Sequence, residues 1–219
     1  MGPCGSLLGD GAPGHYFSVA YAREDPARAP ALTLAEPPFT VEYWFRLAGA
    51  QQRTFVGTRE GEAQGWRLGV SAAGVSGAVF GGFDHLVTTP LRDDAWHHVA
   101  WTYDGRESVL FVDGRVVGRE LYRVEVRPSA RPIVLAGLHA GADTRGAPGQ
   151  LDEVRVSRGA RYRGPFAPPR RHAVDGETLA LWHFDPRAPS RDASALAHPG
   201  RIVGPLLSRD DAAPFCERG

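Results

Sequence analysis

The sequence contains no lysine and no asparagine, so all 25 of its basic residues are arginine. Without asparagine there is no acceptor for N-linked glycans, and Asp-Gly has to serve the tight turns that Asn-Gly often forms. The basic residues are balanced by 25 acidic residues, and this net charge of zero gives no reason to expect a nucleic acid or an anionic membrane as a partner. The absence of lysine and asparagine is typical of a bacterial genome rich in G and C.

Long apolar runs are also missing from the chain. Because no stretch reaches the roughly 18 apolar residues of a membrane-spanning helix, we expect no membrane span. The first residues, MGPCGSLLGDG, lack the charged region and the apolar core of a signal peptide. The chain as given is therefore expected to be either cytosolic or the mature form of an exported protein with a replaced start.

Cysteine is scarce, and its two copies, Cys4 and Cys216, lie near opposite ends of the sequence. If the first and last strands are neighbours, a Cys4–Cys216 disulfide would remove roughly 5 kcal/mol of unfolded-state entropy. Such a disulfide would indicate an oxidising compartment. Two free thiols are the alternative. A third is a lipidated Cys4, although Pro3 stands where a lipoprotein would have a small residue.

Glycine, proline and aromatic residues are plentiful. The 27 Gly and 18 Pro favour many short strands and frequent turns over long helices. The 10 Phe, 6 Tyr and 5 Trp provide ample apolar surface for a core. Since all-β chains of this length commonly form one domain, we predict a single domain over residues 1–219, with its core at about residues 15–205.

The stretch Trp96–Gly118 predicts an antiparallel meander. Its runs VAWTY and SVLFV each end in Asp-Gly, at Asp104–Gly105 and Asp113–Gly114, and Asp-Gly tolerates the positive φ angles of a type I′ turn. Strand alternation puts large rings on both faces of the first run, so both faces should be covered, as in a sandwich. One face carries His97, Val99, Trp101 and Tyr103, and the other carries Trp96, His98, Ala100 and Thr102.

The remaining alternating segments predict further strands. These are His15–Tyr21, Phe39–Leu47, three short strands between residues 54 and 82, Leu121–Val126, Pro132–Gly137, Gly149–Tyr162, Thr178–Asp185 and residues 200–205. We expect an exposed loop in LHAGADTRGAPG, and a single helical turn at the end of Gly149–Tyr162.

Five motifs in order along the chain resemble the laminin-G-like branch of the concanavalin A-like lectin/glucanase superfamily. They are FTVEYWFRL, WHHVAWTYDG, LFVDG, GQLDEVRVSRGARY and TLALWHFDP. The resemblance extends from about Tyr16 to Gly204. It implies an all-β fold, a jelly-roll sandwich of two antiparallel sheets with adjacent first and last strands. It also implies an extracellular binding or adhesion module.

Two activities of that superfamily have no clear counterpart here. The pentraxin-like branch binds calcium through carboxylates just after the strand that PIVLAG matches, where this chain has Leu138, His139 and Ala140, with Asp143 nearby. The glucanase branch needs an E-x-D-x-E strand, which alternation turns into two carboxylates on one face. This sequence has the adjacent pair Asp152–Glu153 instead, and alternation turns the two apart. Asp143 and Asp152 are weak metal candidates, and no cofactor is expected.

Aromatic side chains beside glycines or in loops are candidates for stacking on a sugar. Each competes with a core role for the same ring. The candidates are Trp66, Phe83, His85 and Tyr122. The eight histidines show no spacing typical of a metal site, and His97 and His98 cannot both point at one ion.

The sequence therefore predicts a noncatalytic module, secreted or at the cell surface, that recognises a glycan or a cell-surface protein. One alternative is a glycosidase or polysaccharide lyase of the same fold. Another is a structural module that packs against a second domain or forms an oligomer through edge strands and exposed rings.

Overall fold

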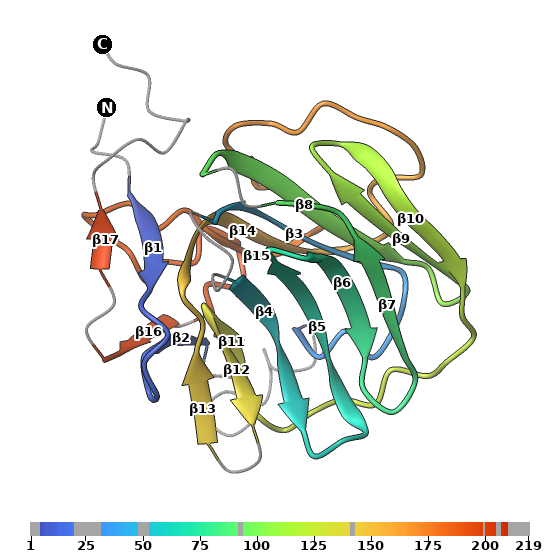
Figure 1. Cartoon of the computed structure of the whole chain (residues 1–219), viewed down its shortest axis with the longest axis horizontal. Coiled ribbons are helices and arrows are strands. Elements are labelled where there is room, and N and C mark those ends of the chain that lie inside the picture. Colours follow the sequence, from blue (N-terminus) through green and yellow to red (C-terminus); the bar gives the residue numbers. More distant parts are fainter. Residues whose placement is uncertain are drawn as a thin grey trace.

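The chain folds into two antiparallel β-sheets that face each other (Figure 1). This computed structural model describes residues 5–19, 32–47, 53–91, 94–140, 143–198, 200–204 and 207–209. The predicted all-β, concanavalin A-like sandwich is confirmed. Among the described residues, no helix has the length and apolar character needed to cross a membrane.

Eight strands form the first sheet, in the order β10-β9-β8-β3-β14-β1-β17, with β15 also paired to β14. They are β1 (Ser6–Gly9), β3 (Phe39–Arg46), β8 (Trp96–Tyr103), β9 (Glu107–Val112), β10 (Arg115–Leu121), β14 (Gly149–Arg158), β15 (Thr178–Trp182) and β17 (Leu207–Arg209).

Seven strands form the second sheet, in the order β16-β2-β11-β4-β5-β6-β7. They are β2 (Tyr16–Val19), β4 (Arg53–Glu60), β5 (Gln64–Ser71), β6 (Gly74–Val79), β7 (Phe83–Thr88), β11 (Ile133–Leu135) and β16 (Gly200–Val203). A separate hairpin consists of β12 (Gly137–Ala140) and β13 (Asp143–Gly146).

The predicted meander is present as β8, β9 and β10. Asp113 and Gly114 have φ angles of 49° and 72° and connect two paired strands directly, as a type I′ turn requires. The turn at Asp104–Gly105 differs, because Tyr103 pairs with Ser108 and leaves a longer loop. There the carboxylate of Asp104 accepts the backbone N–H groups of residues 106 and 107, which fixes the loop without a I′ turn.

Besides the turn at Asp104–Gly105, three local predictions were wrong. Leu121–Val126 is not a strand, because β10 ends at Leu121 and the hydroxyl of Tyr103 bonds the backbone of Tyr122 and Val124 in place of a strand partner. The loop expected in LHAGADTRGAPG contains the hairpin β12–β13. The helical turn expected near Tyr162 is an irregular segment.

That irregular segment, residues 159–177, lies across the outer face of the first sheet, and we call it the covering segment. Its prolines exclude a regular strand, so it attaches through single hydrogen bonds. The Phe166 amide donates to Gly114 O (2.9 Å), and Pro169 O accepts from Trp44 Nε1 (3.1 Å). Phe166 also packs edge-on against Phe111, with ring centroids 5.4 Å apart. Both faces of the central strands are therefore covered, as the two-sided placement of rings predicts.

The first and last strands are adjacent, since β1 lies between β14 and β17 and pairs Leu7 with Ser208. This confirms that part of the expected jelly roll. Cys4 and Cys216 lie outside the described residues, so their disulfide stays a prediction.

Aromatic rings fill the space between the sheets. Trp101 is fully buried and meets Phe39 edge-on at 5.0 Å, and its Nε1 donates to Ser108 Oγ at 3.0 Å. Gly77 of the opposite sheet lies against the same indole, where an added Cβ would be 2.7 Å from its atoms. The sheets can approach this closely only because residue 77 has no side chain.

We expect the substitution Gly77→Ala to lower the free energy of unfolding by about 1–3 kcal/mol, because the new methyl group overlaps the Trp101 indole. Urea unfolding followed by tryptophan fluorescence measures this. Gly176→Ala is the matched control, since a Cβ there meets nothing within 4 Å. Equal stability of the two variants would contradict the packing described.

Candidate functional site

The outer face of the second sheet carries an unusual set of side chains between β4 and the β6–β7 turn. Strand alternation turns Trp66, Leu68 and Val70 of β5 into the core. The intervening Arg67 therefore points outward, and so does Phe55 of the neighbouring strand. Gly69 lies under the Phe55 ring, where an added Cβ would be 2.7 Å from a ring carbon. Glycine thus lets this ring lie close against the sheet.

Two rings and two guanidinium groups alternate across this face, and we call them the ring–arginine row (Phe55, Arg59, Arg67 and Phe80). The Arg59 guanidinium lies 4.9 Å from the centroid of the Phe80 ring. Arg67 lies between the rings, 5.6 Å from Phe55 and 5.9 Å from Phe80. These cation–π contacts fix the arginines at the surface, and all four side chains stay partly exposed.

Polar partners complete the row. Arg67 Nη2 donates to Ser76 Oγ at 3.3 Å and to both carboxylate oxygens of Asp84 at 3.3 and 3.4 Å. These are long contacts for a charge-assisted pair, whose ordinary length is roughly 2.7–2.9 Å. Arg59 is paired with Glu62, a strongly exposed carboxylate. The row therefore offers ring faces, guanidinium donors and carboxylate acceptors within one surface.

Two of the four predicted ligand residues are core residues. Trp66 is fully buried and donates its Nε1 hydrogen to Leu32 O at 3.2 Å. His85 is 1% exposed, and its Nδ1 meets Ser108 Oγ at 2.9 Å, the same hydroxyl that Trp101 bonds. Burial lowers the pKa of His85, so this ring is neutral. Neither ring has a free face for a ligand, and a ligand role for them has no support.

The other two predicted residues, Phe83 and Tyr122, stack on each other at the edge where β7 faces β10. Their ring centroids are 3.9 Å apart and nearly parallel, and both side chains are partly exposed. The Tyr122 hydroxyl donates to Glu120, and burial together with this carboxylate raises the pKa of Tyr122 to about 12. Phe83 also contacts Trp101 and Tyr103 of the core. The stack closes this edge of the sandwich, and its ligand role stays a prediction.

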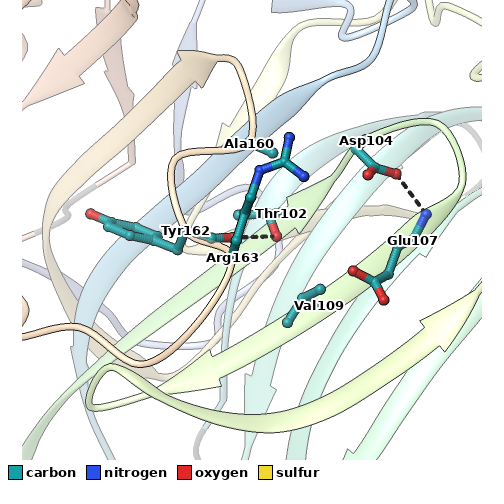
Figure 2. A pocket seen from close by; sticks show the side chains of 7 residues that line it. All are labelled: Thr102, Asp104, Glu107, Val109, Ala160, Tyr162 and Arg163. Carbon is teal, nitrogen blue, oxygen red and sulfur yellow. Dashed lines mark hydrogen bonds between the residues drawn. The ribbon is translucent and has the colours of Figure 1, made fainter.

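A small depression lies on the other sheet, between the β8–β9 turn and the start of the covering segment (Figure 2). It has room for about one water molecule, which is too little for a sugar ring. Its groups are already bonded to one another, as the dashed lines to Asp104 and Thr102 show. We do not assign a ligand to it. The lining residues are Thr102, Asp104, Glu107, Val109, Ala160, Tyr162 and Arg163.

The two predicted metal candidates lie in different settings. Asp143 is exposed in the β12–β13 hairpin, whereas Asp152 is buried in β14. Among the described residues, neither belongs to a group of three possible metal ligands. A bulge in β14 gives Glu153 a φ of 53°, and its carboxylate accepts the His172 amide of the covering segment. The simple alternation expected for Asp152 and Glu153 is therefore broken.

Sequence reasoning missed the ring–arginine row, although part of the signal was present. The alternation that buries Trp66 and Leu68 also turns Arg67 outward, and the glycines in β4–β6 mark places where side chains lie flat on the sheet. The pairing of Phe55 opposite Gly69 could not be known without the register.

Comparison with known proteins gives a consistent result for the fold. A family model described as the concanavalin A-like lectin/glucanases superfamily, laminin G type, matches residues 22–163. No curated protein matches the sequence.

Two solved structures are similar to this one, at 16% sequence identity each. One is a candidate carbohydrate-binding protein from Bacteroides ovatus, with a TM-score of 0.67. The match covers 95% of the present chain and 60% of the Bacteroides chain. The other is the LG4-5 segment of the mouse laminin α1 chain, with a TM-score of 0.52. The match covers 92% of the present chain and 48% of the laminin segment. Identity this low shows the shared fold and leaves the function to be argued from the site.

The buried carboxyl of Asp152 gives a prediction for stability. It is 3% exposed and lies near Glu153, Asp185 and Arg171. Burial, reinforced by the charges of Glu153 and Asp185, raises its pKa well above the ordinary value. The folded state therefore holds this proton more tightly than the unfolded state, and stability is lost as the pH rises through the folded pKa. We expect Asp152→Asn to raise the free energy of unfolding at pH 7 by about 2 kcal/mol.

Urea unfolding at pH 7 and again below the unfolded pKa measures the effect, and the gain should vanish at the lower pH. Asp143→Asn removes an exposed acid and should change neither value. A loss of stability in Asp152→Asn at pH 7 would mean that the folded protein uses the ionised carboxylate.

Proposed function

The chain belongs to the concanavalin A-like lectin/glucanases superfamily, and from this premise we propose that it is a noncatalytic module that binds a glycan on the outer face of its second sheet. The observation that carries the proposal is the ring–arginine row. Its two rings are partly exposed, and Phe55 lies close against the sheet, so both can contact the apolar faces of sugar rings. Its guanidinium groups and the Asp84 carboxylate supply donors and acceptors for hydroxyl groups.

The row is prepared for binding because cation–π contacts hold the arginines before a ligand arrives. Arg67 is fixed between two rings and reaches Asp84 only through long contacts, so a hydroxyl can be inserted between them at little cost. A preformed surface loses less conformational entropy on binding than a mobile one. Recognition then depends on the shape and hydroxyl pattern of the sugar.

The placement of acids favours binding over cleavage. Glycosidases need two carboxyl groups on either side of the bond they break. The two acids paired with the arginines of the row are Asp84, with Arg67, and Glu62, with Arg59. Glu42, Asp152 and Glu153 are at most 3% exposed, so a polysaccharide has no access to them. The similarity to the Bacteroides ovatus protein supports the same class of function.

We expect Phe55→Ala to weaken glycan binding at least about tenfold, because it removes a stacking surface worth about 1.4 kcal/mol or more. Arg67→Gln should weaken it similarly. An array of immobilised plant and bacterial polysaccharides identifies the ligand, and affinity electrophoresis on that polysaccharide compares the variants. Leu121→Ala is the control, since Leu121 is 66% exposed at the end of β10, in the other sheet.

Each other outcome of this experiment has a distinct meaning. Equal binding by Phe55→Ala and the parent would place the site elsewhere. Turnover of a polysaccharide would favour an enzyme. If the molecular mass of the protein in solution rises with its concentration and no glycan binds, self-association is favoured. The edge strands β7 and β10, which carry the exposed Leu86 and Leu121, would form the contact. Loss of binding in chelator would support a calcium requirement, which the row itself does not need.

We also infer that the module acts outside the cell, as a glycan-binding role implies, and that Cys4 and Cys216 form a disulfide. The pairing of β1 with β17 supports the disulfide, because it places Ser6 opposite Arg209, and these residues are close in sequence to the two cysteines. In the denatured and unreduced protein we expect no reactive thiol by titration, and two after reduction. Two reactive thiols before reduction would refute the disulfide.

A further inference from the structure

A second set of groups, on the opposite sheet, is independent of the ring–arginine row. Glu42 of β3, His98 of β8 and His172 of the covering segment meet beneath that segment, on the outer face of the first sheet. All three are buried, with at most 3% of each residue exposed. Three chain segments that are distant in sequence thus bring one carboxylate and two imidazoles together.

The imidazoles of this cluster have unsatisfied nitrogens. Both nitrogens of His172 and Nδ1 of His98 form no hydrogen bond, and Nε2 of His98 has only an ion-pair contact with Glu42. A buried polar atom without a partner is uncommon in a folded protein and often marks an ion or a water. Two such rings turned toward one carboxylate therefore point to a missing ligand.

The distances between the donor atoms suit a small metal ion. Glu42 Oε2 lies 3.2 Å from His98 Nε2 and 3.9 Å from His172 Nε2. Tetrahedral zinc with bonds of about 2.0–2.1 Å has its ligand atoms about 3.3 Å apart. The three atoms all lie within 4.8 Å of one another, so small side-chain movements would bring them to this spacing.

We propose that Glu42, His98 and His172 hold a divalent transition-metal ion, with zinc as the expected ion, between the first sheet and the covering segment. Two histidines and a glutamate form a known ligand set for zinc. The ion ties the covering segment to the sheet and has a structural role, since the site is closed to solvent.

The second carboxylate oxygen of Glu42 is already in use. Arg155 reaches Oε1 through Nε and Nη2, each at 2.8 Å, which leaves Oε2 to face the imidazoles. The Tyr162 hydroxyl donates a hydrogen bond to Oε2 at 2.9 Å, so a fourth polar group lies beside the three proposed ligands. The positive charge of Arg155 opposes a second cation and sets a limit on the affinity, so the ion should be lost to a strong chelator.

The experiment measures metal content and thermal stability of the full chain. The protein is stripped with EDTA, dialysed against micromolar zinc chloride and analysed by elemental mass spectrometry. We expect about one zinc per chain and a higher Tm in zinc than in EDTA. His172→Gln should lose the zinc and the difference in Tm. His97→Gln should keep both, because His97 bonds Asp113 outside the cluster.

Three outcomes would overturn the proposal. The first is a parent protein with no zinc above the buffer blank, and the second is a His172→Gln variant that retains it. The third covers the case in which His172→Gln does not fold. In that case the parent protein is loaded with cobalt(II). If it lacks the visible absorption of a tetrahedral cobalt site, the assignment is refuted.

Discussion

The structure depends on covering the central strands of the first sheet on both faces. The inner faces of β3 and β8 pack rings such as Phe39 and Trp101 against the second sheet. Their outer faces hold Glu42, which is fully buried and paired with Arg155. A buried ion pair is stable only while both charges keep their partners and stay away from competing water. The covering segment supplies that protection, so an irregular stretch of chain is as necessary to the fold as a strand.

The two outer faces of the sandwich therefore differ in what they leave available. On the first sheet, the covering segment occupies the face with Tyr162, Phe166 and His172. On the second sheet, glycines such as Gly69 let Phe55 and Arg67 lie along the strands and remain partly exposed. Rings that are half in water retain apolar surface that a ligand can still cover. This difference is why we propose recognition on the second sheet, since the covering segment already occupies the outer face of the first.

Sequence reasoning predicted what depends on neighbours along the chain. Alternation in Trp96–Tyr103 gave the two-sided strand, and Asp113–Gly114 gave the tight turn. It failed where distant segments decide the outcome. Tyr122 and Val124 bond the Tyr103 hydroxyl instead of a strand partner, and Glu153, at the bulge in β14, bonds the covering segment. The disulfide and the extent of the domain stay predictions.

Two of the four candidate ligand residues are buried in the core for a different reason. Trp66 and His85 share a face with residues that alternation already assigns to the core, so their burial was available from the sequence. Conversely, Arg67 was visible as an outward residue, but its partners Phe55 and Phe80 come from other strands and turns. The register between strands decides which side chains lie together on a binding surface, and single residues beside glycines do not reveal that register.

The two proposed sites are separated by the core, and this bears on how they can influence each other. Energetic coupling between distant sites requires an element with two discrete arrangements that both sites bias. Between these sites stand close-packed contacts, such as Trp101 against Gly77, where an added methyl group would already overlap the ring. The hydrogen bonds from Trp101 through Ser108 to His85 also fix the two sheets in one relation. An ion under the covering segment therefore stabilises the fold as a whole without altering the geometry of the ring–arginine row.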